Sequence, residues 1–280
     1  MKTIISLFFL ILVGFVSCQK EHDDQKLGET INLPLTFVEG IGPDGFGYSL
    51  LAEEHKKDDP SARIWVKTYL PVKGIPGTWR GVKKSMVPLN LKQLIYQNYK
   101  AGKISQEEFD ELKKSWEWEL NPEELSAEPI KCYVYVVSGT DKEGLIAVII
   151  DANNNLDFSD DEPFYPKRIA MDSSMMRYSE SEKQYVLYEV FQDGRVVSKQ
   201  VPMIIRRTNV LPLAYTFPQY AITQLKVKGQ THTIALNNAG RPDYEGSKLT
   251  LVDQDTTVMK GFTDWVAKGE LLSVADFWIR

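Results

Sequence analysis

Oxygen-bearing side chains alternate along the segment DANNNLDFSDDE, residues 151–162. Five occupy every second position from the start, and a sixth closes the segment: Asp151, Asn153, Asn155, Asp157, Ser159 and Glu162. With Asp160 and Asp161, the segment carries five carboxylates and no Lys or Arg. These carboxylates repel one another unless a cation lies among them. Calcium prefers several oxygen ligands, whereas zinc prefers His and thiolate, so the segment predicts a calcium site.

The segment resembles the calcium loop of the EF-hand family, whose ligand positions coincide with these six residues. The resemblance implies that Glu162 is a bidentate ligand, that Asp157 offers its backbone carbonyl, and that Ser159 binds directly or through water. Leu156 stands where the family has Gly, and a left-handed backbone is costly for a residue with a Cβ. We therefore expect a locally different turn, entered here from a strand. A solvated acidic turn is the alternative interpretation.

The start of the chain has the organisation of an export signal, residues 1–17. Lys2 precedes an apolar run over residues 4–16, and small Ser17 precedes Cys18. The run is shorter than the roughly 20 apolar residues of a membrane-spanning helix. The string FVSC resembles the lipobox of bacterial lipoproteins, which implies that Cys18 is lipidated and becomes the new N-terminus. An ordinary secretory signal with an incidental Cys is the alternative.

Residues 18–30 are expected to form a tether, because the string QKEHDDQK at 19–26 has no apolar side chain to bury. A basic residue followed by acidic ones, close to the lipidated Cys, resembles the surface-export signal of Bacteroidota lipoproteins. The resemblance implies a location at the bacterial outer membrane, on the cell surface or on the periplasmic face. The expected partners are the membrane, through the anchor, and envelope proteins or glycans.

The composition excludes several classes of protein. The chain has 280 residues, 43% of them hydrophobic, which is ample for one or two packed domains and excludes wholesale disorder. A net charge of −5 gives no field that attracts phosphates, so nucleic acid is not an expected partner. With Cys18 lipidated, Cys132 has no internal disulfide partner. Because Cys132 lies in an apolar strand, burial is its expected role and nucleophilic catalysis is not.

The strongest helical pattern covers residues 89–120. Apolar residues recur at spacings of three and four up to Tyr99, and Gly102 stands at a C-terminal cap position. Ser105 and Glu108 form a capping box that predicts a second helix from Gln106. The two helices are expected to form a helical hairpin.

Most of the remaining pattern predicts strands. Antiparallel hairpins are expected where two apolar runs flank a short polar turn, at 131–137 with 145–150, 184–191 with 195–206, and 222–228 with 231–236. Alternation also predicts a strand over 64–70. The predicted fold class is α+β, mostly antiparallel and sandwich-like, with one helical hairpin. A polar stretch near Ser173 suggests two domains, 31–172 and 173–280.

No nucleophile elbow, dinucleotide-binding loop or phosphate-binding loop occurs in the chain. His232 shares alternation with Ile234, which favours a structural role, and Trp79 is the one Trp expected to be exposed. The predicted function is that of a lipid-anchored envelope protein with a calcium-stabilised loop, a binding or scaffold module without catalysis. The alternative is an envelope hydrolase directed at glycans, with a carboxylate pair that sequence alone does not identify.

Overall fold

The computed structural model describes residues 33–43, 47–56, 58–59, 62–170, 177–227, 229–238, 240–244, 246–252, 265–267, 272–274 and 277–279. The predicted signal, Cys18 and the predicted tether lie outside these residues. In the described part of the chain, no helix is both long enough and apolar enough to cross a bilayer.

The chain divides into two compact units. Unit 1 comprises Met1–Gly47, Pro218–Gly240 and Tyr244–Arg280, and unit 2 comprises Tyr48–Phe217 with Arg241–Asp243. This division differs from the one expected from sequence, because the residues on both sides of position 173 belong to unit 2. The prediction of a β-rich α+β fold is confirmed, since the sheets are mostly antiparallel.

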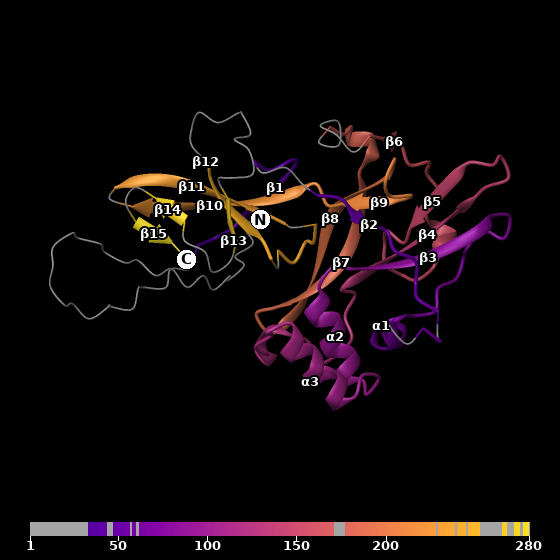
Figure 1. Cartoon of the computed structure of the whole chain (residues 1–280), viewed down its shortest axis with the longest axis horizontal. Helices are drawn as coiled ribbons and strands as arrows, with labels where there is room; N and C mark the ends of the chain where they lie inside the picture. The colour runs from indigo at the N-terminus through magenta and orange to yellow at the C-terminus, as the bar shows by residue number, and fades with distance from the viewer. Residues whose placement is uncertain are drawn as a thin grey trace. The chain divides into compact units, whose positions relative to one another are not determined.

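A three-stranded antiparallel sheet in unit 2 leads to the acidic segment. Its order is β3 (Arg80–Pro88), β4 (Tyr133–Thr140) and β5 (Ile146–Ile150), so the predicted hairpin of β4 and β5 is confirmed (Figure 1). Val148 and Ile150 of β5 pack into one core, while Ile149 packs into another on the opposite face. A strand buried on both faces needs apolar residues throughout, which explains the unbroken run in its sequence.

The second sheet of unit 2 is built around the long strand β8 (Arg195–Thr208). The order is β2 (Ser49–Leu50), β9 (Ala214–Thr216), β8 and β6 (Arg168–Ile169), and β7 (Gln184–Gln192) also pairs with β8. β6 runs parallel to β8 and the other pairs are antiparallel. Asp193 and Gly194 both have positive φ in the β7–β8 turn, as a tight hairpin requires.

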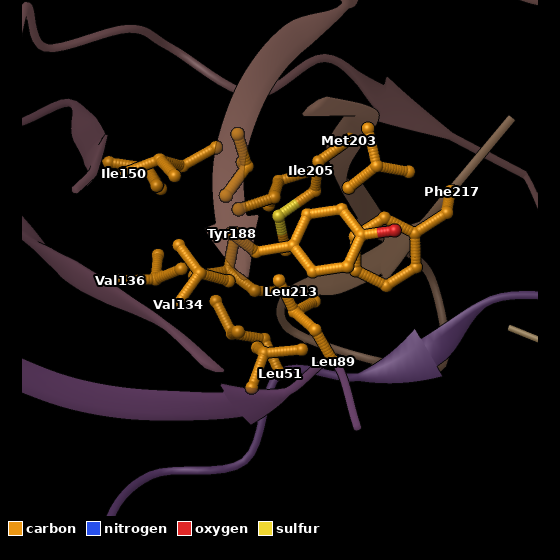
Figure 2. Packing of buried hydrophobic residues seen from close by; sticks show 14 residues of the cluster. Leu51, Leu89, Val134, Val136, Ile150, Tyr188, Met203, Ile205, Leu213 and Phe217 are labelled. Atoms are coloured by element: carbon orange, nitrogen blue, oxygen red, sulfur yellow. The ribbon is translucent and has the colours of Figure 1, made fainter. Parts of the chain in front are cut away.

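The main core of unit 2 lies between these two sheets (Figure 2). Val134, Val136 and Ile150 from the three-stranded sheet pack with Tyr188, Met203 and Ile205 from β7 and β8. Met203 and Val136 are fully buried. This packing fixes the end of β5, the point at which the acidic segment begins.

The helical hairpin is confirmed as α2 (Leu91–Lys100) and α3 (Gln106–Ser115). Ser105 and Glu108 form the predicted capping box, and Gly102 has a φ of +72°. α3 ends before residue 120, where the predicted helical pattern stops, because Glu117 takes a left-handed φ of 49°. A one-turn 3-10 helix, η2 (Pro122–Glu124), follows.

The predicted strand over 64–70 is wrong, since this segment contains the helix α1 (Arg63–Thr68). The alternation over 64–70 suggested a strand, but contacts with the hairpin favour a helix. Lys67 Nζ lies 2.7 Å from Oε1 of buried Glu108, and Trp65 stacks on Trp116 with ring centroids 6.5 Å apart. Tertiary contacts of this kind outweigh a weak local propensity.

Unit 1 contains the sheet β1 (Thr36–Glu39), β10 (Gln219–Val227), β11 (Gln230–Asn237), β12 (Lys248–Val252) and β13 (Trp265–Ala267), in that order. A two-stranded sheet pairs β14 (Leu272–Val274) with β15 (Phe277–Ile279). The expected hairpin of β10 and β11 is confirmed. The core of this unit includes Leu225, Ile234 and Leu236.

Candidate functional site: the acidic loop after β5

The acidic loop, residues 151–162, starts with a carboxylate that no solvent reaches. Asp151 is 0% exposed, and its backbone N–H donates to the carbonyl of Tyr135 at 3.0 Å. Its Oδ1 accepts the N–H of Asn155 and its Oδ2 accepts the N–H of Leu156, each at 2.9 Å. One buried side chain therefore turns the loop back onto the end of β5.

Side-chain oxygens at every second position form a chain of turns. The Oδ1 of Asn153 accepts the N–H of Asn155 at 3.1 Å, and the Oδ1 of Asn155 accepts the N–H of Asp157 at 2.7 Å. The Oδ1 of Asp157 accepts the N–H of Ser159 at 3.1 Å and its hydroxyl at 2.7 Å. The two-residue spacing thus has a local structural use, because such turns satisfy successive backbone donors.

Asp160 joins the two Asn side chains of the loop. Its Oδ2 accepts the amide Nδ2 of Asn153 at 3.0 Å and that of Asn155 at 2.9 Å. All three side chains belong to exposed residues. The oxygen-rich surface of the loop is therefore organised by hydrogen bonds within the loop itself.

Asp161 is the residue whose carboxylate is least satisfied. Its Oδ1 accepts the N–H of Ala152 at 3.2 Å, while its Oδ2 is buried without a hydrogen-bond partner among the described residues. Burial raises the pKa of Asp161 to about 6, and the nearby charges of Asp151, Asp160 and Asp157 act in the same direction. Burial also raises the pKa of Asp151. The ionised forms of these two carboxylates are therefore disfavoured. A bound proton or a nearby cation reduces this unfavourable free energy.

A strap formed by residues 72–75 runs parallel to the loop beside Asp157. The N–H of Lys73 donates to the carbonyl of Leu156, and the N–H of Phe158 donates to the carbonyl of Lys73, both at 3.0 Å. The Nζ of Lys73 lies 3.0 Å from Oδ2 of Asp157. The hydroxyl of Ser159 and this ammonium lower the pKa of Asp157 to about 2. Lys73 is thus a counter-ion that the sequence segment itself lacks.

The strap also explains how Leu156 occupies the position at which the EF-hand loop has Gly. The expectation of a different turn is wrong here, because Leu156 takes a left-handed φ of 66°. Leu156 packs against a core that includes Phe158, as do Val72 and Ile75 of the strap. These contacts and the hydrogen bond to Lys73 compensate the cost of left-handed backbone. Gly74 is needed for the approach, because a Cβ there would lie 2.4 Å from Oδ1 of Asp157 and from the N of Ser159.

The loop is fastened to β7 as well. Asn154, with a φ of 55°, donates from Nδ2 to the carbonyls of Tyr133 and Leu187. The N–H of Leu187 donates to the carbonyl of Ala152 at 2.8 Å. Hydrogen bonds to β4, to the strap and to β7 therefore fix the loop.

The structure brings together five of the six predicted ligands: Asp151, Asn153, Asn155, Asp157 and Ser159. Glu162 is exposed and makes no hydrogen bond in the described part of the chain. Asp161, one position earlier, turns inward instead; the run of three acids offered no basis for choosing among them. Within the described ranges, no three acidic, His or Cys side chains form a ready-made metal group.

Other residues considered from sequence have structural positions. Cys132 is fully buried with its Sγ 3.7 Å from Oε1 of Gln97, and burial raises the pKa of the thiol. Trp79 is half-buried rather than exposed, because its ring covers Gly139. His232 lies in β11 with a buried Nε2. Among the residues considered from sequence, those of the acidic loop are therefore the candidates for ion binding.

No family model, no curated protein and no solved structure matches this chain. The arrangement of the loop must therefore be interpreted from its own residues. All the side-chain atoms of the loop that could ligate a cation are oxygens, and oxygen ligands suit a hard cation better than zinc.

Proposed function

We propose that this protein is a lipid-anchored binding or scaffold module of the bacterial outer membrane, and that its acidic loop binds calcium. Cys18 carries the lipid, after removal of residues 1–17. The observation that supports the calcium proposal best is the buried, unpartnered Oδ2 of Asp161 beside Asp151 and Asp160. A cation near these oxygens offsets burial and the mutual repulsion of the carboxylates, which together raise the pKa of Asp161.

The residues proposed to hold the ion are the predicted set, Asp151, Asn153, Asn155, Asp157, Ser159 and Glu162, with Asp161 added from its inward position. Calcium supplies charge neutralisation here. The side chains of Asn153 and Asn155 retain oxygen lone pairs besides those that accept N–H groups. Lys73 competes with the ion for Asp157.

The expected contribution of calcium is modest. At a dissociation constant of ~10⁻⁴ M and ~1 mM calcium, mass action gives about 1.4 kcal/mol. This corresponds to a rise in melting temperature of roughly 3 to 6 °C for a unit of this size. Calcium is therefore proposed to order the loop rather than to create the fold.

Thermal unfolding with calcium or with a chelator tests the site. We expect calcium to raise the melting temperature of the wild type, and Asp151→Ala with Glu162→Ala to abolish the rise. Asp161→Asn and Glu162→Gln, tested separately, identify which acid at the end of the loop is the ligand. Glu143→Gln, in the exposed β4–β5 turn, is the matched control and should leave the response unchanged. An equal calcium response in the Asp151/Glu162 double variant contradicts the proposal.

Membrane fractionation tests the anchor. Cys18→Ala should move the protein from the salt-washed membrane fraction to the soluble fraction, whereas Cys132→Ala should leave it on the membrane. The salt wash matters because weak electrostatic attachment would otherwise remain. Unchanged partitioning of the Cys18→Ala protein contradicts lipidation.

A further inference from the structure

The first half of β8 has one edge that no strand covers in the described part of the chain. β7 pairs with Arg195–Met203 along the other edge. The N–H of Leu187 in β7 donates to the acidic loop rather than to β8, so Leu187 and Gln200, which face each other, form a non-hydrogen-bonded pair. The backbone groups of Gln200 therefore point away from β7. By alternation, those of Ser198 and Val196 point the same way.

These three residues form the open edge of β8. Val196, Ser198 and Gln200 each offer an N–H and a C=O, and none of these groups has a hydrogen-bond partner among the described residues. All three residues are exposed, Val196 to 46%. The pairing with β7 has no bulge, and Pro202, which lacks an N–H, lies beyond the open edge. An edge of this regularity is a template for one more strand.

Lys199 lies within the open edge and restricts what can pair with it. Its side chain is on the face of β8 that carries Val201, a residue of the main core, and it is half-buried there. Burial alone lowers the pKa of Lys199, and its ammonium pairs with no acid among the described residues. An added strand would cover this ammonium further. Such a strand must therefore bring a carboxylate, because a buried charge without a counter-ion is costly.

A second copy of this chain does not meet that requirement. The segment Arg195–Val201 contains no acid, so two open edges paired with each other would give neither Lys199 a carboxylate. The two ammonium groups would also lie on the same face of the joined sheet, where like charges repel. An inward-pointing charge on an edge strand is one way in which proteins prevent such pairing. The same argument excludes a purely apolar strand.

We propose that the open edge of β8 binds an extended segment of another envelope protein as an added strand, with an acidic residue of that segment opposite Lys199. The backbone groups of Val196, Ser198 and Gln200 supply affinity, and Lys199 supplies selectivity. Polar residues of the partner face Ser198 and Gln200, because these side chains are on the exposed face. This inference rests on the proposed role as a binding module, and it specifies the chemistry of the partner.

Peptide titration of isotope-labelled residues 19–280, followed by NMR, tests the proposal. The probe is the blocked peptide Thr-Val-Thr-Glu-Thr-Val-Thr, and the comparison peptide has Gln in place of Glu. The sequence is symmetric, so either strand direction can place the central residue opposite Lys199. We expect chemical-shift changes at the amides of Val196, Ser198 and Gln200, and about tenfold tighter binding of the Glu peptide. Lys199→Met should make the two peptides bind equally, whereas Lys142→Met, in the exposed β4–β5 turn, should preserve the preference.

Ser198→Pro tests the pairing itself. It removes one outward N–H and leaves the bonds to β7 intact, so it should weaken the Glu peptide about tenfold. Ser198→Thr keeps the N–H and is the matched control, expected to bind within about twofold of the wild type. Melting temperatures of the variants exclude unfolding as the cause of lost binding.

Several results overturn the proposal: no binding of the Glu peptide, equal binding of both peptides by the wild type, or binding that Ser198→Pro leaves unchanged. A dimer that Ser198→Pro dissociates would assign the edge to a second copy instead. Slow hydrogen exchange at Val196, Ser198 and Gln200 in the free chain would show that the chain itself already covers the edge. None of these results bears on the Cys18 anchor or the calcium loop, because fractionation and the calcium response test those separately.

Discussion

Gly74→Ala probes whether the strap over residues 72–75 is seated on the acidic loop as described. A methyl group at this position meets two obstacles at once. The backbone has a φ of +75°, and the added Cβ would lie 2.4 Å from both Oδ1 of Asp157 and the N of Ser159. The second obstacle includes a backbone atom, so rotation of a side chain cannot remove it.

The cost of the substitution follows from these two terms. Left-handed backbone costs Ala about 1 to 2 kcal/mol. Moving the strap away weakens the two hydrogen bonds between Lys73 and the loop, to Leu156 and from Phe158, at about 1 kcal/mol each. We therefore expect Gly74→Ala to destabilise unit 2 by about 2 to 4 kcal/mol.

Gly144→Ala is the control that separates the two terms. Gly144 has a φ of +83°, but nothing lies within 4 Å of an added Cβ. Its cost should be limited to about 1 to 2 kcal/mol for the backbone conformation. The difference between the two variants measures the contact of strap and loop alone.

Two assays report the outcome. Urea unfolding gives the free energies, and amide hydrogen exchange gives the local effect at Phe158, whose N–H donates to Lys73. Gly74→Ala should accelerate exchange at Phe158, and Gly144→Ala should not. Equal destabilisation by both variants, with unchanged exchange at Phe158, would refute the seating of the strap.

Three further variants test how individual charged side chains contribute to stability and to calcium binding. Lys73→Met should lower metal-free stability by less than about 1 kcal/mol, because the ammonium of Lys73 is largely in solvent. It should also lower the calcium concentration at half-saturation severalfold, and an unchanged titration midpoint would contradict competition for Asp157. Glu182→Gln should cost about 3 kcal/mol at neutral pH in urea unfolding, because it removes a carboxylate 2.9 Å from Nε of Arg206, which is 2% exposed. Burial raises the pKa of Glu182, but hydrogen bonds from Arg206, Ser179 and Lys167 outweigh it and lower the pKa from 4.5 to about 2. The stability this ionised group contributes is present above pH 4.5 and is lost as the pH falls toward 2, so Glu182→Gln should flatten acid unfolding in that window. Asp161→Asn should reduce the calcium-induced rise in melting temperature and remove its decline below about pH 6, which a ligand acid with a raised pKa produces; an unchanged pH profile would exclude Asp161 as a ligand.

Local signals explain which elements the sequence predicts well. The capping box of Ser105 and Glu108 and the turn of Asp193 and Gly194 are formed by neighbours in the chain, and both occur as expected. The prediction of a strand over 64–70 fails because α1 depends on distant residues. Its Lys67 pairs with Glu108, 41 residues away, and its Trp65 stacks on Trp116. Those contacts do not exist until the hairpin has folded.

Part of the acidic loop could likewise be predicted from local sequence, and part could not. Alternation of oxygen-bearing side chains, from Asp151 to Ser159, indicated which residues associate, because each turn forms over two residues. It did not indicate which of three successive acids turns inward, since that depends on the N–H of Ala152. The strap, with its Lys73 counter-ion, comes from a segment about 80 residues earlier and has no signature in the loop.

The turns within the loop account for its spacing but not for its charge. Asn or Ser at positions 157, 160 and 161 would accept the same N–H groups, and would do so without mutual repulsion. Burial first, and then the charges of the neighbouring acids, raise the pKa of Asp161 to about 6, while Lys73 compensates Asp157 only. An oxygen that accepts one N–H still has a lone pair for a cation. The excess of carboxylates over what the turns require is therefore the physical reason to look for a divalent ion here.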